Sequence, residues 1–114
     1  MKRILVLGAG AMGSAFTVPC VDNNNDVVLV GTHLEDATIE IIKKEENFHK
    51  ILNCKLPKNL RVEKFEKFQD EIKKKPDLTV IGVNSKGIEW AGKEISKNYN
   101  SSASILLLTK GLTI

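Results

Sequence analysis

The stretch that decides the fold is residues 3–23, which read RILVLGAGAMGSAFTVPCVDN. The apolar run Arg3–Leu7 leads into a glycine-rich turn, and a helical pattern follows from about Ala11 to Asn23. A continuous apolar run is typical of a central parallel strand, because such a strand is covered on both faces. The glycines have the spacing GxGxxG, which between a strand and a helix indicates a dinucleotide-binding turn; they are Gly8, Gly10 and Gly13.

Each glycine of this turn has its own physical role. Gly8 permits the sharp turn, Gly10 lets the backbone approach a pyrophosphate, and Gly13 lets the helix pack close to the strand. Unpaired N–H groups and a partial positive charge at the helix N-terminus also favour a phosphate there. The turn therefore predicts binding of NAD or NADP.

The rest of the chain alternates apolar runs of strand length with longer helical segments, which favours a parallel sheet with crossover helices. The predicted order is β-α-β-α-loop-α-β-α-β. We therefore predict one α/β domain over residues 1–114, a Rossmann-type doubly wound, mainly parallel sheet with helices on both faces. The further predicted strands are Val27–Val30, Leu78–Val83 and Ser104–Leu108, the helices are Glu35–Glu46, Glu66–Lys74 and Lys86–Lys97, and the loop is Asn47–Leu60.

Helical spacing also predicts which faces are buried. The helix from Ala11 to Asn23 is apolar nearly all round, so it should be well buried, with Pro19 bending it. Trp90 falls on the outer face of its helix and should be at least partly accessible. The expected inner residues are Ala37, Ile41 and Ile42 in one helix, and Ile88, Ala91, Gly92 and Ile95 in another.

Composition excludes several classes of protein. The hydrophobic content of 42% and charged content of 27% are ordinary for a soluble globular domain. The net charge of +3 is mild, and Lys73–Lys75 fits a solvated helix end better than a nucleic-acid patch. No apolar run approaches the roughly 18 residues of a membrane span, and glycines interrupt the stretch that could resemble a signal peptide. We expect a cytoplasmic protein.

The two cysteines point neither to a disulfide framework nor to a metal. Cys20 and Cys54 have neither CxxC nor zinc spacing. We expect each to be a small apolar filler in a reducing compartment, and no metal site.

The end of the second strand should influence the choice of cofactor. An acidic residue there would accept hydrogen bonds from the adenosine 2′-hydroxyl and repel a 2′-phosphate. This chain has Thr32 and His33, which can donate to a phosphate, whereas Glu35 and Asp36 come slightly late in the sequence. We therefore expect NADPH to bind as well as NADH or better.

Three further segments narrow the function. Leu56–Leu60 resembles the "LPxNL" segment of NAD(P)-dependent glycerol-3-phosphate dehydrogenases, Val83–Ser85 their "VPS", and Thr109–Leu112 their "TKGL". With the glycine-rich turn, these segments follow the family's order over nearly the whole chain. The resemblance implies an oxidoreductase that transfers a hydride between the nicotinamide and dihydroxyacetone phosphate, giving sn-glycerol 3-phosphate.

The resemblance also implies the site. In the family, residues around the glycine turn contact the cofactor, and the lysine matching Lys110 lies where cofactor and substrate meet. Lys110 is therefore the catalytic candidate, since its ammonium could attract the substrate phosphate or stabilise a developing alkoxide. The chain departs from the family at Ala11-Met12, usually Ser-Trp, at Thr32, often Arg, and at Asn84, usually Pro. The cofactor contacts implied beyond the glycines are Ala11, Met12, Thr32, His33, Val83, Asn84, Ser85 and Lys110.

The family carries its substrate-recognition helices and another active-site lysine in a second, helical domain that follows this region. We therefore expect this chain to bind the dinucleotide without turnover, and the full-length enzyme to act on a small phosphorylated substrate as a homodimer. One alternative is a ketopantoate reductase, whose opening is similar to residues 4–13 but which tends to carry Asn in place of Lys110. Another is a non-catalytic module that senses NAD(P).

Overall fold

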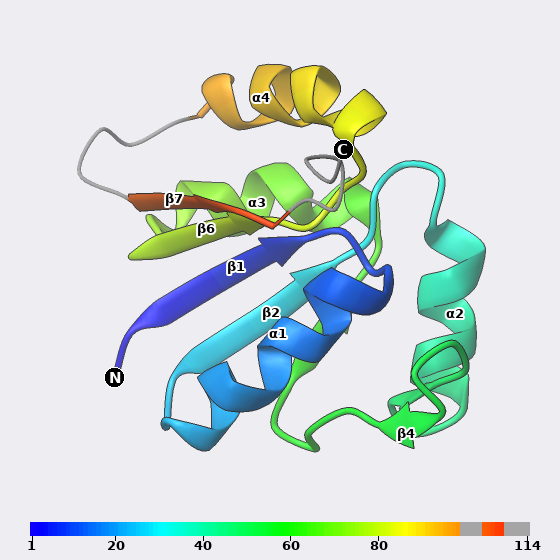
Figure 1. Ribbon diagram of the computed structural model, residues 1–114. Helices are drawn as coiled ribbons and strands as arrows, with labels where there is room; N and C mark the ends of the chain where they lie inside the picture. The colour runs from blue at the N-terminus through cyan, green and yellow to red at the C-terminus, as the bar shows by residue number, and fades with distance from the viewer. Residues whose placement is uncertain (99–103, 109–114) are drawn as a thin grey trace, which may run out of the picture.

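The computed structural model describes residues 1–98 and 104–108, which form a five-stranded parallel sheet between two layers of helices (Figure 1). The strand order is β5-β2-β1-β6-β7. In this order the chain runs outward from β1 through β2 and later returns to β6 on the other side of β1, so β1 adjoins the topological switch point. The strands are β1 (Arg3–Leu7), β2 (Asp26–Val30), β5 (Arg61–Glu63), β6 (Leu78–Ile81) and β7 (Ser104–Leu107).

The register brings the carboxyl ends of the three central strands to one level. Leu7 at the end of β1 pairs with Val30 on one side and with Ile81 on the other. The turns that follow these three strands therefore meet at the same edge of the sheet. This is the edge at which open α/β sheets bind ligands.

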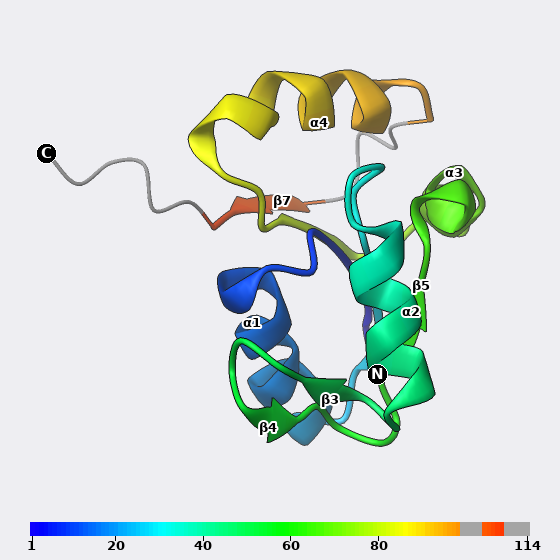
Figure 2. The same cartoon turned by 90° about the vertical axis from the view of Figure 1, so that its right-hand side faces the viewer.

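Helices cover both faces of the sheet, as the edge-on view shows (Figure 2). Ile4 and Val6 face the layer of α1 (Ala11–Asp22) and α2 (Asp36–Lys44). Leu5 and Leu7 alternate with them and face the layer of α3 (Phe68–Lys73) and α4 (Ile88–Ser96). Short 3-10 turns precede the last two helices, η1 (Phe65–Lys67) and η2 (Ser85–Gly87). The predicted fold class is confirmed.

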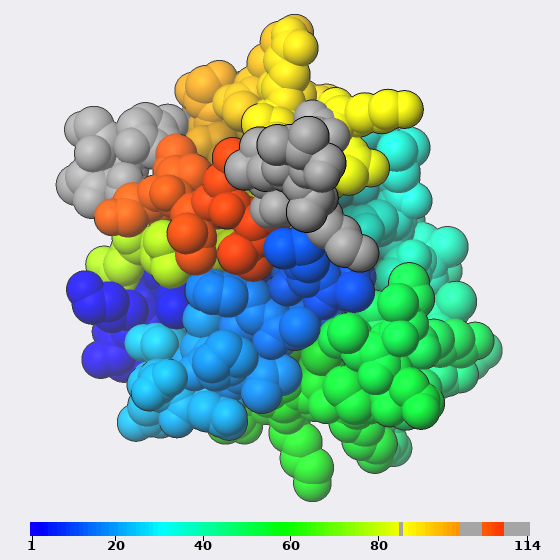
Figure 3. Space-filling model, viewed as in Figure 1, coloured from blue at the N-terminus to red at the C-terminus, as the bar shows by residue number. Residues whose placement is uncertain are grey.

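The prediction of a loop over residues 47–60 is partly wrong, and the strand that follows it was not predicted. The loop contains a two-stranded antiparallel hairpin of β3 (Phe48–His49) and β4 (Cys54–Lys55), which lies beside α1 in the space-filling view (Figure 3). The sequence reading also omitted β5, which pairs with β2 at the edge of the sheet. Both are too short to show a period, and β5 has a single apolar residue between two charged ones.

The predicted inner faces need three corrections. In α1 the buried residues are mostly small or hydroxylic, because this helix passes close to the glycine turn, and Phe16 and Val18 are only half-buried. In α2 the buried stripe is Ile39 and Ile42, while Ala37 and Ile41 are exposed. In α4 Ala91 and Ile95 are buried as predicted, but Gly92 is exposed.

Two single residues complete the comparison. Pro19 lies inside α1, as predicted. Cys20 is buried, but Cys54 is exposed on the hairpin, so its assignment as a core filler was wrong.

In the described part of the chain, no helix is long and apolar enough to cross a membrane.

Candidate functional site

A cavity of about 730 Å³ opens at the carboxyl ends of β1, β2 and β6. Its size falls in the range of small-molecule sites. Six of the residues predicted from the sequence line it: Gly8, Gly10, Thr32, His33, Val83 and Asn84. Six others were not among the predicted site residues: Leu34, Glu35, Gly82, Lys86, Gly87 and Trp90.

The glycines of the turn divide into two that pack and one that leaves space. Gly8 has a φ of +117°, and a Cβ there would lie 2.5 Å from the carbonyl oxygen of Gly82. A Cβ on Gly13 would collide with the carbonyl of Gly8. Around Gly10, by contrast, a Cβ would meet nothing within 4 Å, and this residue lines the cavity. The turn therefore holds β1, β6 and α1 close together and leaves backbone exposed to the cavity at Gly10.

The amino end of α1 faces this space without a side-chain cap. Gly10 is its N-cap residue, with extended backbone and no side chain to accept from the first-turn N–H groups. Such uncapped groups favour an anion. Ala11 is half-buried and Met12 is exposed, but neither lines the cavity.

Glu35 fixes the glycine turn to the end of β2. Its Oε1 accepts a hydrogen bond from the backbone N–H of Ala9 at 2.9 Å and another from that of Thr32 at 2.8 Å. Glu35 is the N-cap residue of α2, and its side chain points back toward the strand. Glu35 comes slightly late in the sequence for a strand-end acid, but the start of α2 returns its carboxylate to Thr32 at the end of β2.

His49 holds the same peptide from the other side. Its Nε2 lies 2.9 Å from the carbonyl oxygen of Ala9, and its Nδ1 accepts from the backbone N–H of Leu52 at 3.2 Å. Because Nδ1 is the acceptor, Nε2 carries the proton and donates to Ala9. His49 is 1% exposed, so the hairpin that carries it is part of the support of the glycine turn. No pattern in the sequence indicates this contact, since it joins residues 40 positions apart.

The remaining predicted residues differ in how they are placed. Asn84 caps η2, its Oδ1 accepting from the N–H of Gly87 at 3.0 Å. Ser85 lies in η2, and Lys110 lies outside the described residues. Within residues 1–98 and 104–108, no three His, Cys, Asp or Glu side chains gather as metal ligands would.

Trp90 is partly accessible, as predicted, but it lies elsewhere than expected. It packs against the core cluster of α3 and α4, and its ring is 4.5 Å from the His33 ring, centroid to centroid. The prediction that it lies opposite the inner face of α4 was wrong, because the buried face is rotated away from Gly92 and toward Trp90.

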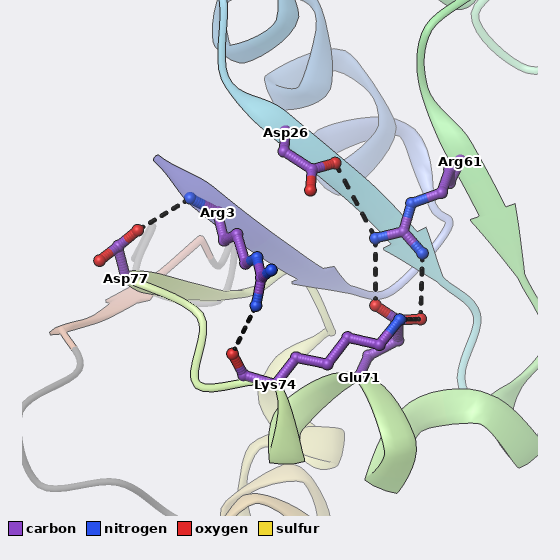
Figure 4. A network of polar contacts seen from close by, with 6 residues as sticks. All are labelled: Arg3, Asp26, Arg61, Glu71, Lys74 and Asp77. Atoms are coloured by element: carbon purple, nitrogen blue, oxygen red, sulfur yellow. Dashed lines mark hydrogen bonds and ion pairs between the residues drawn. The ribbon is translucent and has the colours of Figure 1, made fainter. Parts of the chain in front are cut away.

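A smaller cavity, about 220 Å³, lies at the opposite end of the sheet, at the amino ends of the strands. Paired charges line it, and Figure 4 shows their contacts. Arg61 donates to both carboxylate oxygens of Glu71, at 3.1 and 3.2 Å, and Lys74 donates to the same carboxylate at 3.1 Å. Arg61 also pairs with Asp26 at 3.9 Å. Burial alone raises the pKa of Glu71, but the hydrogen bonds from Arg61 and Lys74 outweigh it and leave that pKa below its ordinary value.

Comparison with known proteins identifies a family that this chain matches. Residues 3–114 match the family described as the NAD-dependent glycerol-3-phosphate dehydrogenase N-terminus. The chain is 34% identical over 110 residues to an NADP(+)-dependent glycerol-3-phosphate dehydrogenase of Archaeoglobus fulgidus, covering 96% of this chain and 31% of that protein.

Two solved structures share the fold. The glycerol-3-phosphate dehydrogenase of Coxiella burnetii has a TM-score of 0.80 at 20% identity, covering 98% of this chain and 33% of that one. A putative 2-dehydropantoate 2-reductase of Enterococcus faecalis has a TM-score of 0.67 at 26% identity, covering 99% and 35%. The chain thus spans about a third of the length of the proteins that it matches.

Proposed function

The chain belongs to the family of the NAD-dependent glycerol-3-phosphate dehydrogenase N-terminus, and from this premise we propose that it holds the dinucleotide in an enzyme that interconverts dihydroxyacetone phosphate and sn-glycerol 3-phosphate. The observation that carries the proposal is the cavity at the carboxyl ends of β1, β2 and β6, with the glycine-rich turn in its wall. The name of the Archaeoglobus fulgidus relative supports it.

The residues present fit a dinucleotide. Gly10 leaves its backbone open to the cavity, and the uncapped start of α1 favours the pyrophosphate charge. Glu35 holds Ala9 and Thr32 in place and presents a carboxylate to the same cavity. When bound, the nicotinamide supplies the hydride chemistry, while the protein supplies position and charge.

Both cofactors are proposed to bind. Thr32 and His33 can donate to a 2′-phosphate, but the carboxylate of Glu35 lies beside Thr32 and repels one. The expectation that NADPH binds as well as NADH or better rested on the lack of an acid at Thr32 or His33. With Glu35 there, that reason no longer holds, and the preference depends on the balance between the two effects.

Lys110 is proposed as the catalytic group of this chain, on the resemblance of Thr109–Leu112 to the family's "TKGL". It follows β7, whose carboxyl end lies on the same edge of the sheet as the cavity. An ammonium there would attract the substrate phosphate or stabilise negative charge on the substrate oxygen. Substrate recognition is proposed to involve a second domain in the whole protein, as the resemblance to the family implies.

A ketopantoate reductase is the second candidate, because the Enterococcus faecalis protein shares the fold at 26% identity. An activity assay of the whole protein distinguishes the two candidate functions. NADH or NADPH oxidation is followed with dihydroxyacetone phosphate and, separately, with ketopantoate. We expect oxidation with the first substrate, and its loss in Lys110→Met. Oxidation with ketopantoate alone would contradict the proposal. Cofactor binding with no oxidation by either substrate would favour a sensing module.

A further inference from the structure

The backbone of Ala9, inside the glycine-rich turn, is held by hydrogen bonds on both sides. Its N–H donates to Oε1 of Glu35 at 2.9 Å. Its carbonyl oxygen has two partners, the hydroxyl of Ser14 at 3.1 Å and Nε2 of His49 at 2.9 Å. Ala9, Ser14 and His49 are all buried, so water does not compete for this carbonyl. The contacts therefore fix both the peptide before Ala9 and the peptide after it.

The carbonyl of Ala9 shares one planar peptide group with the N–H of Gly10. In a trans peptide these two groups point in opposite directions, and the described residues contain no cis peptide bond. Holding the carbonyl toward Ser14 and His49 therefore points the N–H of Gly10 away from them. Within residues 1–98 and 104–108 this N–H donates to no acceptor, and Gly10 lines the cavity. The N–H is thus left for a ligand.

His49 reaches this peptide from outside the cavity. It lies in the hairpin of β3 and β4, and none of residues 48–55 lines the cavity. Its ring is itself oriented, because Nδ1 accepts from the backbone N–H of Leu52 in the same hairpin at 3.2 Å. This contact leaves the ring proton on Nε2, which donates it to Ala9. The hairpin therefore presents a donor of fixed direction to the peptide between Ala9 and Gly10.

We infer that His49 is a positioning residue for nucleotide binding, which holds this peptide so that the N–H of Gly10 faces a phosphate group in the cavity. The inference rests on the proposed function, because the phosphate is that of the bound nucleotide. Without the ring, only Ser14 holds the carbonyl of Ala9, and the peptide is free to turn from the phosphate. A donor that is already oriented lowers the cost of binding. His49 therefore raises affinity for the phosphate and leaves affinity for the nucleoside unchanged.

Two substitutions separate the two contacts of the ring. His49→Gln places an amide nitrogen near the position of Nε2, so it still donates to Ala9. His49→Asn is shorter, so its amide oxygen still accepts from Leu52 but its nitrogen does not reach Ala9. In calorimetry, ADP should bind about tenfold more weakly to His49→Asn and within about twofold of the parent to His49→Gln. Circular dichroism checks the folding of each variant.

Adenosine is the matched control ligand, because it lacks the phosphates. Its affinity, measured by NMR titration, should be the same in the parent and in both variants. Equal loss of ADP affinity in the two variants, or equal loss for ADP and adenosine, would show that His49 only supports the fold and would contradict the inference.

The parent chain supplies a further test that holds even if neither variant folds. Long-range ¹H–¹⁵N NMR should find the ring proton of His49 on Nε2, and a proton on Nδ1 would overturn the inference. If the parent binds NADH but His49→Asn binds ADP as tightly as the parent does, the inference alone is wrong. If the parent binds neither ADP nor NADH, the proposed function fails as well.

Discussion

The two ends of the sheet differ in whether their charged and polar groups are paired within the protein or left open to a ligand. At the amino ends, Arg61 and Lys74 meet the buried carboxylate of Glu71, so each charge has a partner (Figure 4). At the carboxyl ends, Gly10 lines the cavity without a side chain, and the carboxylate of Glu35 accepts from the backbone N–H groups of Ala9 and Thr32.

We infer from this difference that the amino ends contribute mainly to stability and the carboxyl ends mainly to ligand binding. In a network of paired side-chain charges, the donors and acceptors already have partners, so few groups remain to bind a ligand. A turn held by its own backbone contacts leaves N–H groups for one. Substitutions at the amino ends should therefore change the free energy of unfolding, and those at the carboxyl ends should change nucleotide binding.

The largest effect is expected at Gly10. Gly10→Val places a branched side chain in the cavity where the pyrophosphate must approach, and NADH affinity should fall about a hundredfold or more, about 2.7 kcal/mol. Its matched control is Gly92→Val, since Gly92 also has open space around a Cβ but lies on α4 outside the cavity wall. Calorimetry should find NADH affinity unchanged in the control. Equal affinities in the two variants would mean that the turn is not the site.

The next effect is expected at the other end of the sheet. Glu71→Gln removes the charge that accepts from Arg61 and Lys74, and should lower the free energy of unfolding at pH 7 by about 2 kcal/mol. NADH affinity should stay the same. Urea denaturation followed by circular dichroism gives the first quantity and calorimetry the second.

The stability contributed by Glu71 should also depend on pH. Its pKa is lowered in the folded chain, so its contribution is fully present above the ordinary carboxyl pKa and is lost as pH falls through the folded value. The difference between Glu71→Gln and the parent should therefore be constant near neutral pH and shrink below about pH 4. A difference that grows on acidification would contradict the assigned charge pairs.

The smallest effect concerns cofactor choice. Glu35→Gln keeps an oxygen that can accept from Ala9 and Thr32 but removes the charge that repels a 2′-phosphate. The affinity ratio of NADPH to NADH should rise about fivefold, about 1 kcal/mol, which is the interaction of two unit charges about 4 Å apart in water. Asp36→Asn, one residue along in α2 and exposed, should leave the ratio unchanged. A ratio that responds equally to both changes would place the 2′-position elsewhere.

The sequence predicted the fold through its longest patterns. β1 and β6 are buried on both faces from their second residue onward, over Ile4–Leu7 and Thr79–Ile81, and such runs leave a clear signal in the sequence. β5 was missed because an edge strand of three residues, with charges at both ends, has no such run. The inner face of α2 was misplaced because it covers only the edge of the sheet, where two residues, Ile39 and Ile42, are enough.

The candidate site was predictable where it is local in sequence. The glycine turn and the ends of β2 and β6 were found because each follows an apolar strand. Glu35 was described as slightly late in the sequence, because the return of a side chain from a helix N-cap does not show in sequence spacing. His49 and Trp90 were not assigned to the site, since tertiary packing alone brings them to Ala9 and His33.

The most direct test of the difference between the two ends is an NMR titration of the ¹⁵N-labelled chain with NADH. We predict that the backbone amide signals of Gly8, Gly10 and Thr32 shift most, and that those of Arg61 and Glu71 stay in place. Shifts concentrated at Arg61 and Glu71, or none at saturating NADH, would contradict the assignment of binding to the carboxyl ends of the strands.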